Sequence, residues 1–394
     1  MRLAYIVHDL ADPAVARRLA MLAPHLASAV VIGFHRDAAP PARVAGWPTV
    51  PLGRTEDARL GKRVLSVLRA RLQLGALAPH LAGATVVMSR QLETLVLARA
   101  ARARFAPGAM LVQECLDVHR LLVGGTWKSL AMRRLEGRLL RACDLLLVSS
   151  PAFLREHLVP AHGTALPPAM LVENKVLRAE LAEQAQATAP RPAAAPPWRI
   201  GWYGVIRCRE SLMLLADLVR RLPGRVEVEI RGRPAPSAIP DFEAVVAATP
   251  GLHFLGPYDR RRDLAAMYRG VHFAWAIDYF EAGANSDWLL PNRLYEGSLH
   301  GAVPITLART ETGRWLARHR AGLLLQEPLQ QALPAFFAGL DATGYAAAAA
   351  AVAAIPQADL VEDGAALATA LLQAQAQARD ARQPLPAAGA PVPV

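Results

Sequence analysis

The feature that most constrains the fold is a regular alternation of short apolar runs with longer helical patterns. A parallel strand needs a crossover of a dozen or more residues, usually a helix, before the next parallel strand can form. The alternation therefore predicts an α/β fold with parallel sheets. The strand-like runs of the first half are Leu3–Val7, Ala29–Phe34, Ala84–Met88, Ala109–Gln113, Leu145–Val148 and Ala169–Val172.

The pattern stops once and then restarts. Residues 184–197 are rich in Ala, Pro and Gln, a composition typical of a linker, and a new strand-like run begins at Trp198. A chain of 394 residues also has the length of two domains. We expect a Rossmann-like domain over 1–183, a linker over 184–197, a second Rossmann-like domain over 198–379 and a disordered tail over 380–394.

Ligands of open α/β sheets bind beyond the carboxyl ends of the strands. Two such domains facing each other would form a cleft that is lined by loops of both. The loops that follow strands are therefore the segments in which to look for a site.

The most informative loop leads into a helix expected to begin at Arg293, after Pro291-Asn292. Free backbone N–H groups at a helix N-terminus bind phosphate, and a carboxylate one turn later, Glu296, could hold a ribose diol. The alternative is structural: Asn292 would be a plain N-cap and Glu296 a solvated first-turn acid.

A second loop follows the strand at Trp198–Tyr203 and carries Gly204, Arg207 and Arg209. Glycine lets a backbone approach phosphate closely, and guanidinium groups bind phosphate through paired hydrogen bonds. These residues are candidate donor-binding groups together with Asn292 and Arg293. They could also be ordinary surface arginines on a turn.

Loops of the first half offer candidates for the acceptor. Glu114, Asp117 and His119 follow one strand, and a carboxylate there could act as general base for an acceptor hydroxyl. Capping and salt bridges explain the same residues equally well. His8, Asp9 and Arg90 end two other strands and are, with His119, candidate acceptor-binding residues.

The formal net charge of +11 suits partners that carry phosphate, although an Arg-rich composition alone would also produce it. Lys128 and Arg134 lie on a predicted amphipathic helix with Trp127 and Leu130, which could rest on an anionic bilayer. The alternative is a solvated face of a packed helix. Since no aromatic and basic platform is visible, nucleic acid is not an expected partner.

The segment Pro291–Glu296, followed by Gly301-Ala302-Val303-Pro304, resembles the donor motif of glycosyltransferase family 4 and related GT-B enzymes. The resemblance implies a GT-B fold in which this helix binds a nucleotide-sugar and Glu296 holds the ribose. It also implies that cations of the Arg207 loop contact the diphosphate.

More narrowly, the chain resembles bacterial exopolysaccharide glycosyltransferases of the succinoglycan type, through His8–Arg18, Ser149–Phe153 and Arg207–Leu212. It departs from the family in three places, one of which is a Gly-Gly turn after the first strand that is replaced here by Asp9–Pro13. Many members have a glutamate eight residues before the ribose-binding one, where this chain has Trp288. A His-Asp pair is replaced by Leu116-Asp117.

The predicted function is transfer of a hexose from a nucleotide-sugar, UDP-linked, to a lipid-linked or glycan acceptor in surface-polysaccharide assembly. Asp117 or Glu114 would be the base of an inverting reaction, whereas a retaining reaction would need them only to orient the acceptor. No metal motif is present, so we expect no metal and no cofactor. The expected location is the cytoplasm, at the inner face of the membrane. A nucleotide-sugar 2-epimerase and a non-catalytic glycan- or membrane-binding scaffold remain as alternatives.

Overall fold

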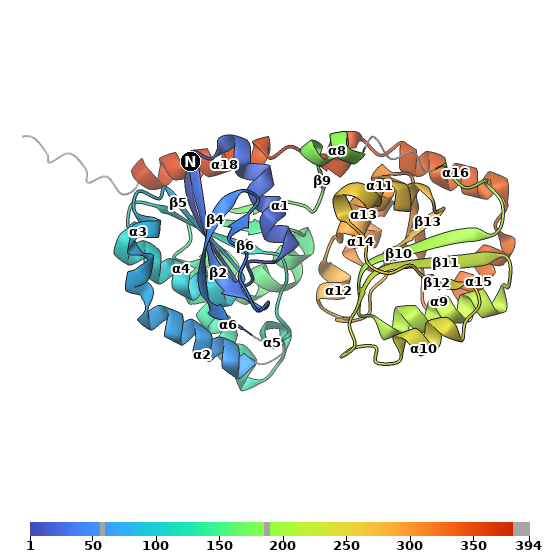
Figure 1. Cartoon of the computed structure of the whole chain (residues 1–394), viewed down its shortest axis with the longest axis horizontal. Helices are drawn as coiled ribbons and strands as arrows, with labels where there is room; N and C mark the ends of the chain where they lie inside the picture. The colour runs from blue at the N-terminus through green and yellow to red at the C-terminus, as the bar shows by residue number, and fades with distance from the viewer. Residues whose placement is uncertain (56–59, 185–189, 381–394) are drawn as a thin grey trace, which may run out of the picture. The chain divides into compact units, whose positions relative to one another are not determined.

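The computed structural model describes residues 1–55, 60–184 and 190–380. The chain forms two compact units (Figure 1). Unit 1 contains Met1–Val148, His157–Val172 and the C-terminal segment from Gly364. Unit 2 contains Ser149–Glu156 and Glu173–Asp363.

Unit 1 is built on an eight-stranded sheet of order β3-β4-β2-β1-β5-β6-β7-β8, parallel except for the β3–β4 pair. Its core consists of the apolar residues of β1 and β5–β7, which are almost completely buried. The strands are β1 (Arg2–Val7), β2 (Ser28–His35), β3 (Arg43–Val44), β4 (Trp47–Arg54), β5 (Val86–Arg90), β6 (Met110–Cys115), β7 (Leu145–Val148) and β8 (Ala169–Leu171).

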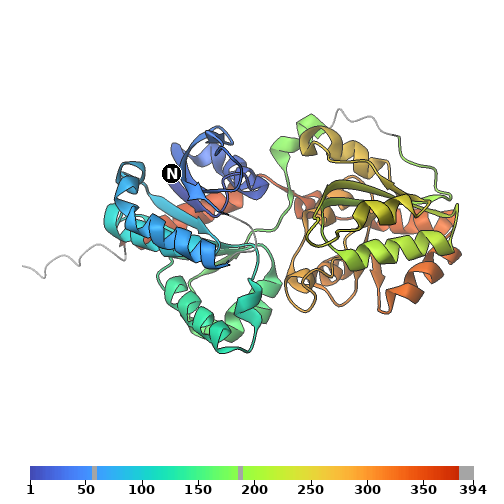
Figure 2. The same ribbon diagram turned by 60° about the horizontal axis from the view of Figure 1, so that its bottom comes forward.

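Helices cover both faces of this sheet. Figure 2 shows α2, in blue, on one face and α18, in red, on the other. The helices are α1 (Pro13–Leu22), α2 (Leu60–Leu72), α3 (Ala78–Leu81), α4 (Leu92–Phe105), α5 (Arg120–Val123), α6 (Trp127–Leu140), α7 (Val159–His162) and α18 (Ala365–Asp380). Asp12 caps α1 by accepting the Ala14 N–H at 2.9 Å, and Pro13 occupies its first turn.

Unit 2 contains a six-stranded parallel sheet of order β12-β11-β10-β13-β14-β15. In order along the chain this is 3-2-1-4-5-6, the order of Rossmann folds. The strands are β10 (Trp198–Ile206), β11 (Val226–Pro234), β12 (Leu252–Phe254), β13 (Phe273–Trp275), β14 (Val303–Leu307) and β15 (Leu323–Leu325). Trp198, Trp202 and Trp275 lie fully buried in its core.

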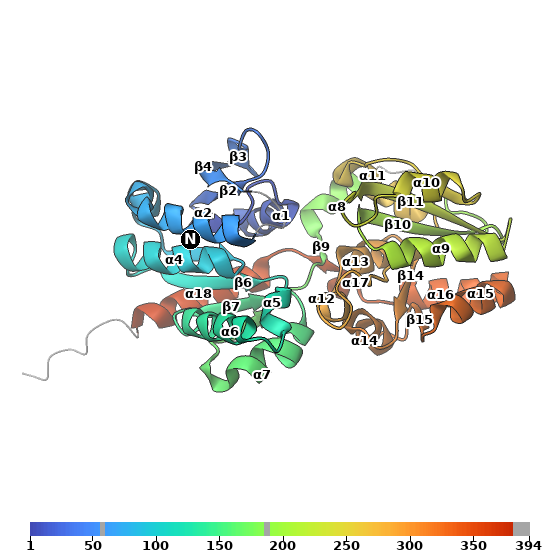
Figure 3. The ribbon, with the colours of Figure 1, turned by 90° about the horizontal axis from the view of Figure 1, so that it is seen from below.

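The helices of unit 2 also lie on both faces of the sheet. In Figure 3, α9 and α11 lie on opposite sides of β10 and β11. The elements are α8 (Arg178–Gln184), α9 (Arg209–Arg221), α10 (Phe242–Ala247), α11 (Arg260–Arg269), α12 (Asn285–Trp288), α13 (Asn292–Leu299), α14 (Glu311–Arg318), α15 (Leu329–Gly339), α16 (Ala342–Ala353) and α17 (Gln357–Leu360). A separate parallel pair joins β9 (Val176–Leu177) to β16 (Val361–Glu362). The predicted α/β class with parallel sheets is confirmed.

The unit boundaries differ from the expected ones at residues 149–156 and 173–183, which group with unit 2 instead of the first domain, and at the C-terminus. We placed residues up to 379 in the second domain, but the chain from Gly364 groups with unit 1, where α18 packs on β6 and α1. Gly364 has a φ of +83°, and a Cβ there would lie 2.2 Å from the Met21 carbonyl oxygen, so this glycine permits the close approach. Of the expected tail, Asp380 ends α18, and residues 381–394 lie outside the described residues.

The expected linker is described only in part, since residues 185–189 lie outside the described range. Gln184 still belongs to α8, and the segment from residue 190 is held on unit 2: His272 Nε2 lies 2.8 Å from the Ala193 carbonyl oxygen. Within the described ranges, no single helix is long and apolar enough to cross a membrane. Among the described helices, α15 and α16 taken together are long and apolar enough, but they are bent by 110° relative to each other.

Candidate functional site

The strand order of unit 2 reverses direction between β10 and β13. The carboxyl ends of these two strands therefore flank the position where Rossmann folds bind their ligands. The loop after β10 contains Arg207 and the loop after β13 contains Asp278, and their side chains lie 3.7 Å apart. Cys208 ties the loops together, because its Sγ accepts the backbone N–H of Ser211 and of Tyr279.

Two glycines bring the backbones of β10 and β11 together beside these loops. Gly204 pairs with Gly232, and both have positive φ angles, +115° and +136°. A Cβ on Gly232 would lie 1.8 Å from the Gly204 carbonyl oxygen. Only glycine fits this arrangement, so the local backbone is fixed at the end of the strand from which Arg207 projects.

The two arginines predicted to hold a diphosphate diverge. Arg207 lies on the β13 side, where its guanidinium stacks over the Phe280 ring at 4.6 Å. Arg209 begins α9 and pairs with Asp241, at the start of α10, at 2.5 Å. The structure therefore brings Arg207 to the strand reversal and directs Arg209 to the β11 side.

Helix α13 begins at Asn292, one residue earlier than expected, and Pro291 takes the N-cap position in place of Asn292. Among the described residues, no side chain caps this helix. Arg293 reaches back toward the end of β13, where its Nη1 lies 3.4 Å from the Trp275 carbonyl oxygen. The N-terminus of α13 therefore lies at the same sheet edge as Arg207, and Asn292 is exposed there.

Glu296 is buried one turn into α13, with 4% of its surface exposed. Its Oε1 accepts Arg260 Nε at 3.0 Å, and Arg260 also binds Glu180 at 2.7 Å. Among the described residues, no hydrogen bond engages Oε2 of Glu296. A buried carboxylate held by one oxygen offers the other to a ligand hydroxyl. This position is the opposite of the solvated acid that was the alternative prediction.

Burial, and then the charge of Glu296, raise the pKa of Tyr258 to about 12. Tyr258 is thus a neutral hydroxyl beside the carboxylate. Tyr258, Arg260 and Glu180 were not identified as candidate site residues from the sequence. Glu180 lies 80 residues before Arg260, and no local pattern joins them.

The acidic side chains of the segment before α13 are bound by neighbouring protein groups. Glu281 accepts the Asn285 side-chain amide at 2.7 Å. Asp287 binds Arg309, which in turn binds Glu327. Trp288, at the position where family members have a glutamate, ends α12.

Glu114 of unit 1 is completely buried and cannot serve as an accessible base. Its carboxylate accepts Arg18 Nε at 2.7 Å, Arg90 Nε at 2.9 Å and the Tyr5 hydroxyl. Burial opposes the charge, but Arg90 and Arg18 outweigh burial and lower the pKa of Glu114 to about 2. Glu114 is therefore the centre of a structural ion network, and its candidacy as catalytic base is corrected on this ground.

Arg90, a candidate for acceptor binding, belongs to the same network. It is 1% exposed, and its remaining nitrogens bind Asp12 at 3.1 Å and the Ala14 carbonyl oxygen at 3.0 Å. Its guanidinium is thus occupied inside the protein, where it fixes the loop after β1 against β5. This contact accounts for Arg90 without a ligand.

The other candidates of unit 1 differ in exposure, and Asp9 is buried, with 7% of its surface exposed. Asp117 and His119 are exposed, and His119 Nδ1 accepts the Leu121 N–H at 3.2 Å as the N-cap of α5. Asp9 accepts the Ala11 N–H at 3.0 Å and pairs with Arg36 at 3.0 Å. His8 differs from these, because its Nδ1 is buried and finds no hydrogen-bond partner among the described residues.

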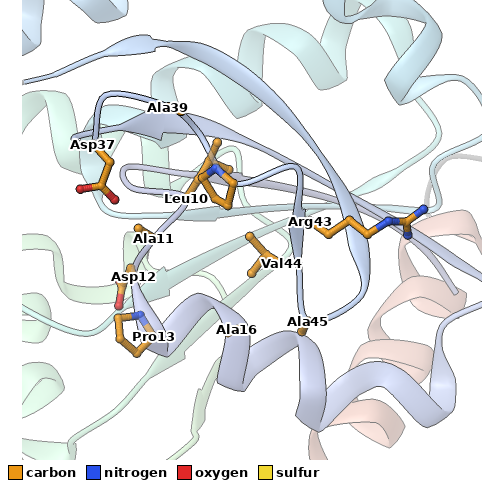
Figure 4. A pocket seen from close by; sticks show the side chains of 11 residues that line it. Leu10, Ala11, Asp12, Pro13, Ala16, Asp37, Ala39, Arg43, Val44 and Ala45 are labelled. Atoms are coloured by element: carbon orange, nitrogen blue, oxygen red, sulfur yellow. The ribbon is translucent and has the colours of Figure 1, made fainter. Parts of the chain in front are cut away.

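A hollow of about 340 Å³ lies between the loops that follow β1 and β2 (Figure 4). Asp12 and Asp37 bring carboxylates to its lining, and Leu10, Ala11 and Val44 supply apolar surface. Carboxylates on an open surface of this size suit hydroxyl-rich ligands.

Helix α6 does not bury the apolar face that its sequence suggested. Trp127 is 76% exposed, Leu130 44% and Leu135 40%, and they share the surface with Arg134 and Arg138. The buried face is instead made by Ser129, Glu136, Gly137, Leu139 and Leu140. A surface with both apolar and cationic side chains suits an anionic bilayer.

We compared the chain with family models, curated proteins and solved structures. No protein-family model matches the sequence. The chain is 42% identical to the succinoglycan biosynthesis protein ExoL of Rhizobium meliloti (strain 1021) over 351 residues, which is 89% of this chain and 87% of that protein.

Solved structures share the fold at low identity. Sucrose-phosphate synthase from Thermosynechococcus elongatus superposes with a TM-score of 0.71 at 14% identity, covering 97% of this chain and 100% of that one. Anabaena HepE in complex with UDP-glucose superposes with a TM-score of 0.62 at 14% identity, covering 97% and 99%. The resemblance predicted from the sequence is confirmed. The chain belongs to the family of the succinoglycan biosynthesis protein ExoL, and its fold is the GT-B fold of glycosyltransferases.

Proposed function

We propose that this protein is a glycosyltransferase of exopolysaccharide biosynthesis that moves a hexose from a UDP-linked sugar to a lipid-linked or oligosaccharide acceptor. The observation that carries the proposal is the open Oε2 of buried Glu296, one turn into a helix that starts at the strand reversal beside Arg207. Such an arrangement fits a ribose next to a diphosphate.

The diphosphate and the ribose of the donor each have candidate partners in this site. The backbone of Asn292 and Arg293 and the Arg207 guanidinium would hold the diphosphate, with Gly204 allowing close approach. Arg209 would reach it only by leaving Asp241. These charges stabilise the nucleoside diphosphate as it departs, so the transfer needs no metal ion and no cofactor.

Two relatives support the choice of reaction and donor. ExoL is a succinoglycan biosynthesis protein by name, and succinoglycan is a polysaccharide. HepE was solved with UDP and with UDP-glucose. We extend a UDP-linked donor to this chain because its site offers the carboxylate and cations that this ligand requires.

We propose that loops of unit 1 bind the acceptor. His8, Asp9 and His119 would contact its hydroxyls, and the hollow beside Asp12 would take a neighbouring sugar. Asp117 is exposed and is the remaining candidate for general base if the anomeric centre is inverted. In a retaining reaction it would orient the acceptor.

A lipid-linked acceptor places the enzyme at a membrane. We propose that the exposed face of α6 rests on the anionic inner leaflet, with Trp127 and Leu130 inserted and Arg134 and Arg138 near the head groups. The location would then be the cytoplasm, at the inner face of the cell membrane.

The test combines binding and transfer. Purified protein is heated with a panel of nucleotide-sugars, and the donor that raises its melting temperature is then supplied, radiolabelled in the sugar, with membranes of a polysaccharide-producing strain. We expect label to enter the lipid fraction with wild type and not with Glu296→Gln. Interconversion of free nucleotide-sugars without transfer would favour an epimerase. Binding with neither reaction would favour a scaffold, and no binding at all would overturn the proposal.

A further inference from the structure

Three side chains of the kinds that commonly bind metals converge inside unit 1, and none of them is a candidate residue for donor or acceptor binding. Glu136 Oε2 lies 2.9 Å from His157 Nε2 and 2.7 Å from His162 Nε2. One potential ligand atom from each residue lies within 4.8 Å of the others. All three side chains are less than 10% exposed.

The fold assembles this cluster from separate elements. Glu136 belongs to the buried face of α6, His157 to a π-helical turn (Phe153–Leu158) and His162 to the end of α7. The next residue of α6 is Gly137, and a Cβ there would lie 2.9 Å from His162 Nδ1. A side chain at position 137 would therefore press on the second imidazole, and glycine leaves it room.

The chemistry of the three ligands is that of a zinc site. Two imidazoles and one carboxylate bind Zn²⁺ with bonds of about 2.0–2.2 Å, and a water often completes the tetrahedron. Such bonds set ligand atoms about 3.4 Å apart. The present spacings of 2.7 and 2.9 Å are those of hydrogen bonds, so the ligand atoms would have to separate by about 0.5–0.7 Å to admit the ion.

We propose that Glu136, His157 and His162 bind one zinc ion, with water as the fourth ligand, and that the ion fastens the chain where it returns to unit 1. Residues Ser149–Glu156 group with unit 2, and His157 is the first residue that groups with unit 1 again. The ion would anchor this return to α6. This anchoring role is independent of the proposed sugar transfer.

The competing explanation is a metal-free cluster, in which Glu136 accepts hydrogen bonds from both imidazoles. His157→Gln and His162→Gln distinguish a zinc site from such a cluster, because a glutamine amide can donate to Glu136 but is a poor zinc ligand. His80→Gln is the matched control, since it removes an exposed histidine from the same unit. The full chain is purified without a histidine tag and stripped with EDTA.

Zinc is then titrated into each protein against a chromophoric chelator, and the melting temperature is followed with and without zinc. We expect one tight site per chain in wild type and His80→Gln. Affinity should fall by more than about 100-fold in either glutamine variant, since losing even an outer-shell partner costs about 10–100-fold. Zinc should raise the melting temperature only of the first two proteins. Equal zinc binding by all four proteins, or no stoichiometric binding by wild type, would overturn the proposal.

Discussion

Replacing Glu114 by Gln should destabilise unit 1 without touching the sugar-transfer chemistry directly. The substitution removes the negative charge that Arg18 and Arg90 share inside the protein. Breaking a buried ion pair from one side costs about 3–5 kcal/mol, because the partner charges stay buried. We expect a loss of this size in the free energy of unfolding at pH 7.

The pH dependence gives an independent magnitude. The pKa of Glu114 is about 2 in the folded protein against an ordinary value of 4.5. A folded pKa below the unfolded one stabilises the fold above pH 4.5, and this contribution disappears as the pH falls through 2. At 1.36 kcal/mol per pH unit the contribution is about 3 kcal/mol at neutral pH. The difference between wild type and Glu114→Gln should shrink by about 2 kcal/mol between pH 7 and pH 3.

The assay must report on unit 1 alone, because a chain of two units need not unfold in a single step. Hydrogen exchange of the amides in β1, β5 and β6 does this, since Tyr5, Arg90 and Glu114 lie on these strands. Asp117→Asn is the control, as it removes an exposed carboxylate two residues after β6. Unchanged exchange in Glu114→Gln, combined with lost turnover, would refute the structural role and restore Glu114 as the base.

Three further outcomes follow from the contacts. Arg207→Gln should weaken nucleotide-sugar binding, measured by calorimetry, by about 10–100-fold, which is the range for charge-assisted hydrogen bonds. Arg209→Gln should weaken it less, because the Arg209 guanidinium is paired with Asp241. Equal losses in the two variants would contradict the divergence of the two arginines. Gly232→Ala should lower the melting temperature by several degrees and abolish donor binding, because the alanine Cβ would clash with the Gly204 carbonyl oxygen. Gly108→Ala should do neither, because a Cβ at position 108 would meet no other atom within 4 Å. Replacing Trp127 and Leu130 by Ser should reduce binding to anionic vesicles about tenfold in co-sedimentation, and Leu72→Ser, which changes an even more exposed leucine on α2, should not. An equal effect of both would argue against α6 as the contact.

The sequence predicted β1, β2 and β5–β8 of the first sheet well, because each is a single apolar run. It missed β4, which contains Pro48 and Pro51 and is half-exposed. Proline cannot donate to a sheet ladder and argues against a strand, but β4 has only the two-residue β3 on its outer side. It could not assign α18 to unit 1, because that depends on a backbone approach at Gly364 that no local pattern encodes.

The same dependence on contacts that are distant in the sequence explains which site residues could be predicted. The Pro291–Glu296 motif was visible because a helix start and its first-turn acid are adjacent in the chain. The partner of Glu296, Arg260, lies 36 residues away, and the partner of Glu114, Arg18, lies 96 residues away. Long-range partners such as these decide whether a carboxylate is open to a ligand or closed in a network. In the sequence, where these partners cannot be seen, Glu114 looked catalytic. In the fold, its contacts with them show that it is structural.

Glu296 is the residue on which the proposed donor site depends most directly. Isothermal titration of UDP and of the selected UDP-sugar into wild type, Glu296→Gln and the control Glu281→Gln measures whether the open Oε2 holds the ribose. We predict micromolar-range binding by wild type, a loss of about 10–100-fold in Glu296→Gln, and a smaller loss in Glu281→Gln, whose carboxylate is bound to Asn285. Equal affinities of wild type and Glu296→Gln, or no binding of any uridine nucleotide to wild type, would contradict the assignment of the donor site.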